Sequence, residues 1–389
     1  MVSTHAREGG QFLQTGQAQD AVKSFQKGLS IDPNDVDCLL GLVRTHLSTG
    51  ASAEAEAAAQ RLLQVRPDHA EAQAHLAMLR AQAGDAEALE SLKTLAAAPT
   101  AGYFERFNLG GLLLERGDLA GARAAYESTL KVAPDSPHVH FELGRICLQQ
   151  NDLNGALASF SKAFEGAPAE AMPLLMLSRV HAARQELGLA VQAGSLALER
   201  AKGPLRRTVL EDLFKLCLQV GNPDAAKRTI LELRQIEPTS LTYVYMHGLA
   251  VMSGGAFAEA KDLFEEVLRN APKSWQARHA LAQAHLALGA REQARKLLEE
   301  AVELVPTDPG PSNDLSVVLV QDGEHARARP MLERVLAAHP NDAGTHLNLA
   351  VVTFPTDKAA SAHHATQARG LGDAQVQAQA MELLKQLGL

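Results

Sequence analysis

The sequence predicts an all-α fold in which pairs of antiparallel helices repeat and stack into one solenoid. The chain is 46% hydrophobic but only 4% aromatic, which is typical of a core made of packed Ala- and Leu-rich helices. Prolines recur at a nearly fixed interval, and a two-helix pattern recurs with them. One such helix pair buries too little apolar surface to be stable alone, so we expect the copies to stack.

The stretch 108–134 shows the two-helix pattern most clearly. Its first helix carries the small Gly110, which leaves room for a neighbouring helix. Gly117 can adopt the left-handed conformation that ends a helix. In the second helix Ala122 permits a close crossing, and Tyr126 is expected to fill the wedge between the helices.

Ten prolines set the period of the chain, because proline cannot continue a helix and ends each pair. Most intervals between them are 34 residues, and the others lie between 32 and 36. The prolines are Pro33, Pro67, Pro99, Pro134, Pro168, Pro204, Pro238, Pro272, Pro306 and Pro340.

With this period, the chain resembles tetratricopeptide-repeat proteins over nearly its whole length. Three features recur in register with the prolines: a Leu–Gly or Leu–small pair, an alanine in mid-repeat, and a large residue four positions later. Examples are Leu109–Gly110, Leu143–Gly144, Leu281–Ala282 and Leu349–Ala350, then Ala21, Ala122, Ala156 and Ala260, then Phe25, Tyr126, Phe160 and Phe264. The resemblance implies a right-handed superhelix whose first helices line a concave groove, and it implies binding of protein or peptide partners there.

The expected organisation is a single solenoid over 2–372, followed by a C-terminal capping helix over 373–389 that shields the last hydrophobic face. The third repeat is two residues short, around 85–95, and the sixth has two extra residues near 202–204, so local kinks are expected at both. The repeats are expected at 2–35, 36–69, 70–101, 103–136, 137–170, 171–206, 207–240, 241–274, 275–308, 309–342 and 343–372.

Composition and motifs restrict the classes of function. The net charge is −8 and no basic block is present, so no nucleic-acid partner is expected. No apolar run approaches the ~20 residues of a membrane span. Phosphate-loop, dinucleotide-binding, zinc-protease and nucleophile-elbow motifs are absent, and we predict no enzyme activity, no catalytic residue and no cofactor.

Cysteines and histidines give no metal-ligand spacing, so no metal site is predicted. Cys38, Cys147 and Cys217 are expected to be buried thiols, which fits a reducing compartment. The predicted location is therefore cytoplasmic, or periplasmic or lipid-anchored if a leader has been removed. His363 and His364 are adjacent on a helix and point about 100° apart, which makes them poor joint ligands.

The register of the repeats selects the residues that would face the groove. One position per repeat holds a cation in three successive repeats, and positions one and two turns earlier hold apolar or aromatic residues. We predict a partner site in which an apolar floor is bordered by a basic line, and which binds a protein or peptide with apolar anchors and acidic groups. The candidate residues are Phe104, Phe107, His138, Phe141, Arg145, Met172, Leu175, Arg179, Lys215 and Tyr245. A second interpretation stays open, in which the aromatics are core and the cations are scattered surface charge.

The preferred function is a non-enzymatic scaffold or adaptor, and the usage of Ala, Leu, Arg and Gln suggests a bacterial protein. A carboxylate clamp of the kind found in some members of the family is not matched, since its positions carry Ala6, Gly10, Gly41 and Ala74. Two alternatives remain: an assembly chaperone or envelope-biogenesis factor for pilus, secretion or polysaccharide-export machinery, and a regulatory arm of a repeat-bearing enzyme. A homodimer is also left open.

Overall fold

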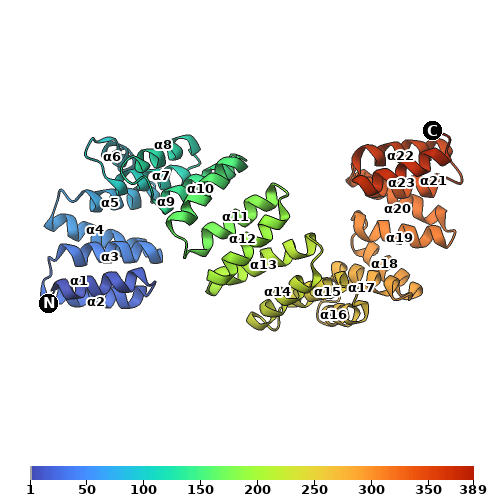
Figure 1. Cartoon of the computed structure of the whole chain (residues 1–389), viewed down its shortest axis with the longest axis horizontal. Helices are drawn as coiled ribbons and strands as arrows, with labels where there is room; N and C mark the ends of the chain where they lie inside the picture. The colour runs from blue at the N-terminus through green and yellow to red at the C-terminus, as the bar shows by residue number, and fades with distance from the viewer. Residues whose placement is uncertain (1) are drawn as a thin grey trace. The chain divides into compact units, whose positions relative to one another are not determined.

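The computed structural model describes residues 2–389, which form 23 α-helices and no β-strand (Figure 1). The helices follow one another in pairs joined by short turns, which confirms the all-α, helix-pair prediction. The chain divides into two compact units that meet between Ala201 and Lys202, and each unit is described by itself below. None of the helices in residues 2–389 has the combination of length and apolar character needed to cross a membrane.

The first unit contains α1 to α12, drawn from blue to light green in Figure 1. Each odd-numbered helix is the first helix of a repeat and packs against the even-numbered helix that follows it. The bounds are α1 Val2–Gln14, α2 Ala18–Ile31, α3 Val36–Thr49, α4 Ser52–Val65, α5 Ala70–Gln82, α6 Ala86–Ala97, α7 Tyr103–Glu115, α8 Leu119–Leu130, α9 Pro137–Gln149, α10 Leu153–Gly166, α11 Ala171–Ala183 and α12 Leu187–Arg200.

The second unit continues the same alternation and ends with an unpaired helix, α23, which packs against α22 and α21. The bounds are α13 Gly203–Gln219, α14 Pro223–Ile236, α15 Leu241–Ser253, α16 Phe257–Asn270, α17 Trp275–Ala287, α18 Arg291–Leu304, α19 Pro309–Gln321, α20 His325–Ala338, α21 Ala343–Thr353, α22 Lys358–Leu371 and α23 Ala374–Gln386.

The turn between α7 and α8 forms as the sequence predicts. Gly117 has φ 79°, in the left-handed region where a side chain would be strained. The Asp118 carboxylate then accepts a hydrogen bond from the backbone N–H of Gly121 at 2.9 Å and caps α8. The same two-step turn, a left-handed residue followed by a capping aspartate, also joins α9 to α10 through Asn151 and Asp152.

The crossing of the two helices in a repeat depends on a glycine that faces a ring. A β-carbon on Gly110 would lie 2.7 Å from Cε1 of Tyr126, and one on Gly144 would lie 2.7 Å from Cε1 of Phe160. Such distances are too short for a real contact, so only glycine allows the ring to lie this close. The predicted roles of Gly110 and Tyr126 are therefore confirmed, and Ala122 is fully buried at the crossing.

One boundary differs from the sequence prediction. The seventh repeat was expected to begin at 207, but α13 begins at Gly203 and runs for 17 residues. The two extra residues near 202–204 thus belong to a longer first helix and not to a longer loop. Pro204 lies in the first turn of α13. Backbone N–H groups in this turn have no partner within the helix, so a proline there removes no helical hydrogen bond.

His247 replaces the leucine that the repeat pattern places in the core of α15. The ring is 6% exposed, and Arg234 donates to its Nδ1 at 2.9 Å. The remaining proton is therefore on Nε2, which has no hydrogen-bond partner and lies 3.8 Å from the Glu259 carboxylate. Burial and the neighbouring Arg234 lower the pKa of His247 below its ordinary value.

The register of α16 makes a prediction about packing. We expect Ala260→Leu, at a fully buried crossing, to destabilise the fold by about 1–3 kcal/mol because the added carbons have no space. Ala258→Leu, at an exposed position of the same helix, is the control and should change the free energy of unfolding by about 0.5 kcal/mol or less. Equal melting temperatures for the two variants would show that the register is wrong.

The lowered pKa of His247 predicts a loss of stability in acid. The unfolded chain takes up the proton first, so the free energy of unfolding falls as pH drops below the unfolded pKa of about 6.5. His247→Leu should lose less stability than the wild type between pH 7.5 and pH 5 in urea denaturation. Part of the pH dependence should remain, because burial beside His346 and His363 also lowers the pKa of His364. The same loss in both proteins would contradict the assignment.

Candidate protein-binding site

An apolar pocket of about 250 Å³ opens between the first helices of the first unit, and we call it the anchor pocket. Helix α9 contributes four of the ten lining residues, and α7, α10, α11 and the turn between α10 and α11 complete the walls. Its lining residues are Phe107, Pro137, His138, Phe141, Glu142, Ala163, Ala167, Glu170, Met172 and Pro173. The pocket therefore brings together four of the predicted site residues, from three successive repeats: Phe107, His138, Phe141 and Met172.

The aromatic walls of the anchor pocket are held in place from behind. Phe107 stacks on Tyr103 with ring centroids 5.2 Å apart and meets the edge of Tyr126 at 5.4 Å. Phe141 packs on Phe160 at 5.4 Å. Met172 is 38% exposed and lies at the surface of the pocket. Because the rings rest on other rings, they cannot fold inward to fill the space.

Two of the predicted cations lie beyond the pocket on the same helices. Arg145 and Arg179 occupy the ninth position of α9 and α11, and both side chains are exposed. Arg145 donates to the Glu142 carboxylate at 2.7 Å, with Arg145 47% exposed and Glu142 17% exposed. One contact uses only part of a guanidinium that has five N–H donors, so Arg145 retains donors for a partner.

Leu175 differs from the prediction, because it is 1% exposed and belongs to the core. It shares a helix face with the buried Ala171 and Ser178, and the Ser178 hydroxyl donates to the Ala190 carbonyl of α12. This face of α11 is therefore covered by α12, and Leu175 cannot contact a partner. The prediction that Leu175 faces the groove is therefore wrong.

Lys215 and Tyr245 lie in the second unit. Lys215 is exposed on α13. Tyr245 is half-buried on α15, where its ring packs on Phe264 at 5.7 Å and burial raises the pKa of its hydroxyl. The alignment of Lys215 with Arg145 and Arg179, and of Tyr245 with Phe107 and Phe141, stays a prediction.

Phe104 lies outside the anchor pocket, within a polar cluster that the sequence did not reveal. Arg44 donates two hydrogen bonds to the Glu71 carboxylate, at 2.7 and 2.8 Å, and stands over the Phe104 ring at 5.3 Å. His75 connects Glu71, at 3.4 Å, with the amide of Asn108, at 3.0 Å. Burial alone would raise the pKa of Glu71, but the hydrogen bonds from His75 and Arg44 lower it. The charge of Arg44 is thus satisfied within the protein.

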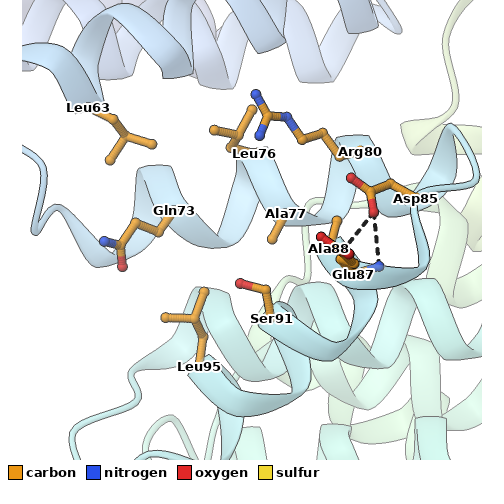
Figure 2. A pocket seen from close by; sticks show the side chains of 10 residues that line it. All are labelled: Leu63, Gln73, Leu76, Ala77, Arg80, Asp85, Glu87, Ala88, Ser91 and Leu95. Carbon is orange, nitrogen blue, oxygen red and sulfur yellow. Dashed lines mark hydrogen bonds between the residues drawn. The ribbon is translucent and has the colours of Figure 1, made fainter.

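A second hollow, of about 500 Å³, lies at the shortened third repeat (Figure 2). Leu63 of α4 faces Ser91 and Leu95 of α6 across it, with α5 side chains between them. At one end Asp85 caps α6 through the N–H groups of Glu87 and Ala88, at 2.9 and 3.1 Å. The two-residue deletion around 85–95 was the signal in the sequence for a local irregularity here.

The cysteines offer no reactive thiol. Cys38, Cys147 and Cys217 are all buried and free, which confirms the prediction for them. Burial raises the pKa of the Cys38 thiol to about 12 and also raises that of Cys217, so both stay protonated at neutral pH. In the part of the chain that the structure covers, no group of three or more His, Cys, Asp or Glu residues is placed to hold a metal ion.

Solved structures share the architecture at low sequence identity. Yeast Tom70 is 15% identical with a TM-score of 0.51, and the match covers 100% of this chain and 95% of that chain. The human IFIT1 dimer with m7Gppp-AAAA is 17% identical with a TM-score of 0.52, over 78% of this chain and 72% of that one. A tetratricopeptide repeat protein from Parabacteroides merdae is 17% identical with a TM-score of 0.51, over 64% and 98%. At these identities the likeness concerns the fold alone.

Sequence comparison supplies the family. No curated protein sequence matches the chain significantly. One tetratricopeptide-repeat family model matches residues 12–83 and 252–310, and another matches residues 107–171. Together the matched segments cover half of the chain, and they include α7 from residue 107 on and all of α9 and α10, which line the anchor pocket. The chain therefore belongs to the tetratricopeptide-repeat family.

Proposed function

We propose that this protein is a non-enzymatic scaffold that binds protein or peptide partners along the first helices of its repeats, with one apolar side chain of the partner in the anchor pocket. The preformed apolar pocket carries this proposal. Its volume of about 250 Å³ lies below the roughly 300–1,000 Å³ of typical small-molecule sites. It suits a single side chain held by a larger interface.

The surroundings of the pocket support a partner that also carries acidic groups. Arg145 is two turns along α9 from His138, and Arg179 is two turns along α11 from Met172. Exposed arginines beside aromatic walls are the residue types that dominate binding energies at protein interfaces. A segment whose apolar residue enters the pocket would place neighbouring carboxylates within reach of these guanidinium groups.

The anchor pocket makes a first prediction about binding. Met172→Glu puts a charge at the surface of the apolar pocket, and we expect the affinity for a captured partner to fall at least about tenfold. Leu189→Glu is the control, since Leu189 is also exposed, at 49%, but lies on the second helix α12 away from the pocket. Equal affinities of the two variants, measured by calorimetry, would remove the pocket from the proposal.

The two arginines make a second prediction. Arg145→Glu with Arg179→Glu should weaken partner binding while the helical circular dichroism is retained, because exposed charge changes alter stability by about 0.5 kcal/mol or less each. The measurement is affinity capture from native lysate with the wild type and the double variant side by side. Lys23→Glu with Lys93→Glu, on the exposed second helices α2 and α6, makes the same change in net charge elsewhere. A folded variant that keeps its partner would place binding on another face.

A further inference from the structure

We infer that the anchor pocket is specific for an apolar residue flanked by a basic one, so that the preferred partner segment carries Lys or Arg beside its anchor. This inference rests on the proposed function and goes one step beyond it. It assigns to Glu170 the role of a specificity-determining residue.

The ionised side chains of the pocket are the first observation. Its ten lining residues include two carboxylates, Glu142 and Glu170, and neither Lys nor Arg. Glu142 is compensated by Arg145 at 2.7 Å and is largely covered. The pocket itself therefore presents negative charge, although the arginines further along the helices are positive.

The carboxylate of Glu170 is the second observation, because it is available to bind a cation of the partner. It is exposed at the N-cap of α11 and makes no side-chain hydrogen bond to that helix. Within residues 2–389 it forms no ion pair. Its position two residues before Met172 places it at the edge of the apolar surface. Arg44 offers the contrast, since Glu71 already binds its guanidinium through two hydrogen bonds.

Helix dipoles do not remove this charge. Helix α10 ends at Gly166 and brings about half a negative charge towards the pocket, and α11 begins at Ala171 with about half a positive charge. The two contributions roughly cancel, and the full charge of Glu170 remains. A cation of the partner that approaches Glu170 also lies beside the aromatic walls, where water is partly excluded and the attraction is strengthened.

The positions of these residues fix the order of charged and apolar groups along the site. Glu170 lies at the N-terminal end of α11, the apolar pocket follows, and Arg145 and Arg179 lie about two turns further on. A complementary segment is basic at one end, apolar at its centre and acidic at the other. A purely acidic segment matches the arginines but places like charge against Glu170.

The test is selection of peptides from a random 12-residue display library on the full-length protein. Wild type should enrich peptides that have a large apolar residue with Lys or Arg within about four positions. Glu170→Lys should keep the apolar residue and lose the basic one. Glu165→Lys is the matched control, because Glu165 is an exposed carboxylate of α10 outside the anchor pocket, and it should select the same peptides as wild type.

A synthetic copy of the best peptide then gives the size of the effect. Replacing its basic residue by Ala should weaken binding to wild type by about tenfold and leave binding to Glu170→Gln nearly unchanged. Apolar enrichment without basic enrichment, or equal losses for both proteins, would overturn the inference and leave the proposed function standing. Selection of the same peptides by Met172→Glu, or no enrichment by wild type, would overturn the anchor pocket and the inference with it.

Discussion

The close approach of a ring to a glycine is the contact on which the rest of the structure depends. A β-carbon on Gly144 would lie 2.7 Å from Cε1 of Phe160, and one on Gly248 would lie even closer to Cε1 of Phe264. The same core ring also supports the surface aromatic three residues before the glycine: Phe141 rests on Phe160, and Tyr245 rests on Phe264. The packing of a core ring on a glycine brings the two helices together. The same ring therefore also supports an aromatic residue at the surface of the first helix of the repeat.

This coupling explains why the anchor pocket is preformed. Phe107 and Phe141 cannot turn inward, because Tyr126 and Phe160 occupy the space behind them and are themselves almost fully buried. Rings fixed before binding lose little conformational entropy when a partner arrives, so more of the contact energy appears as affinity. Stability and recognition in these repeats thus draw on the same packing, and variants that disturb the core rings should alter both.

The sequence predicts the features that recur in every repeat. It does not predict features that depend on one tertiary contact. Phe107 and Phe141 occupy equivalent positions of successive first helices, and His138 and Met172 occupy equivalent positions one turn earlier, so the four side chains line one pocket. Leu175 follows the same register, yet α12 covers it, and periodicity does not show which helix faces are covered. Arg44 was indistinguishable from Arg145 in the sequence, since only the structure brings Glu71, 27 residues away, onto its guanidinium. Glu170 lies between helices and had no place in the repeat pattern.

Arg44, Arg145 and Glu170 differ in how many intramolecular contacts they make, and this number determines how readily each can bind a charged group of a partner. A cation that already forms two hydrogen bonds to one carboxylate, such as Arg44, must break them before it binds a partner, and the loss offsets the gain. Arg145 is held by one hydrogen bond and can add a second carboxylate through its other N–H donors. Glu170 breaks no ion pair when it binds a partner, because it forms none within residues 2–389. In the proposed site, specificity therefore depends on the charges that intramolecular pairing leaves available, and not on the number of charges that line the first helices.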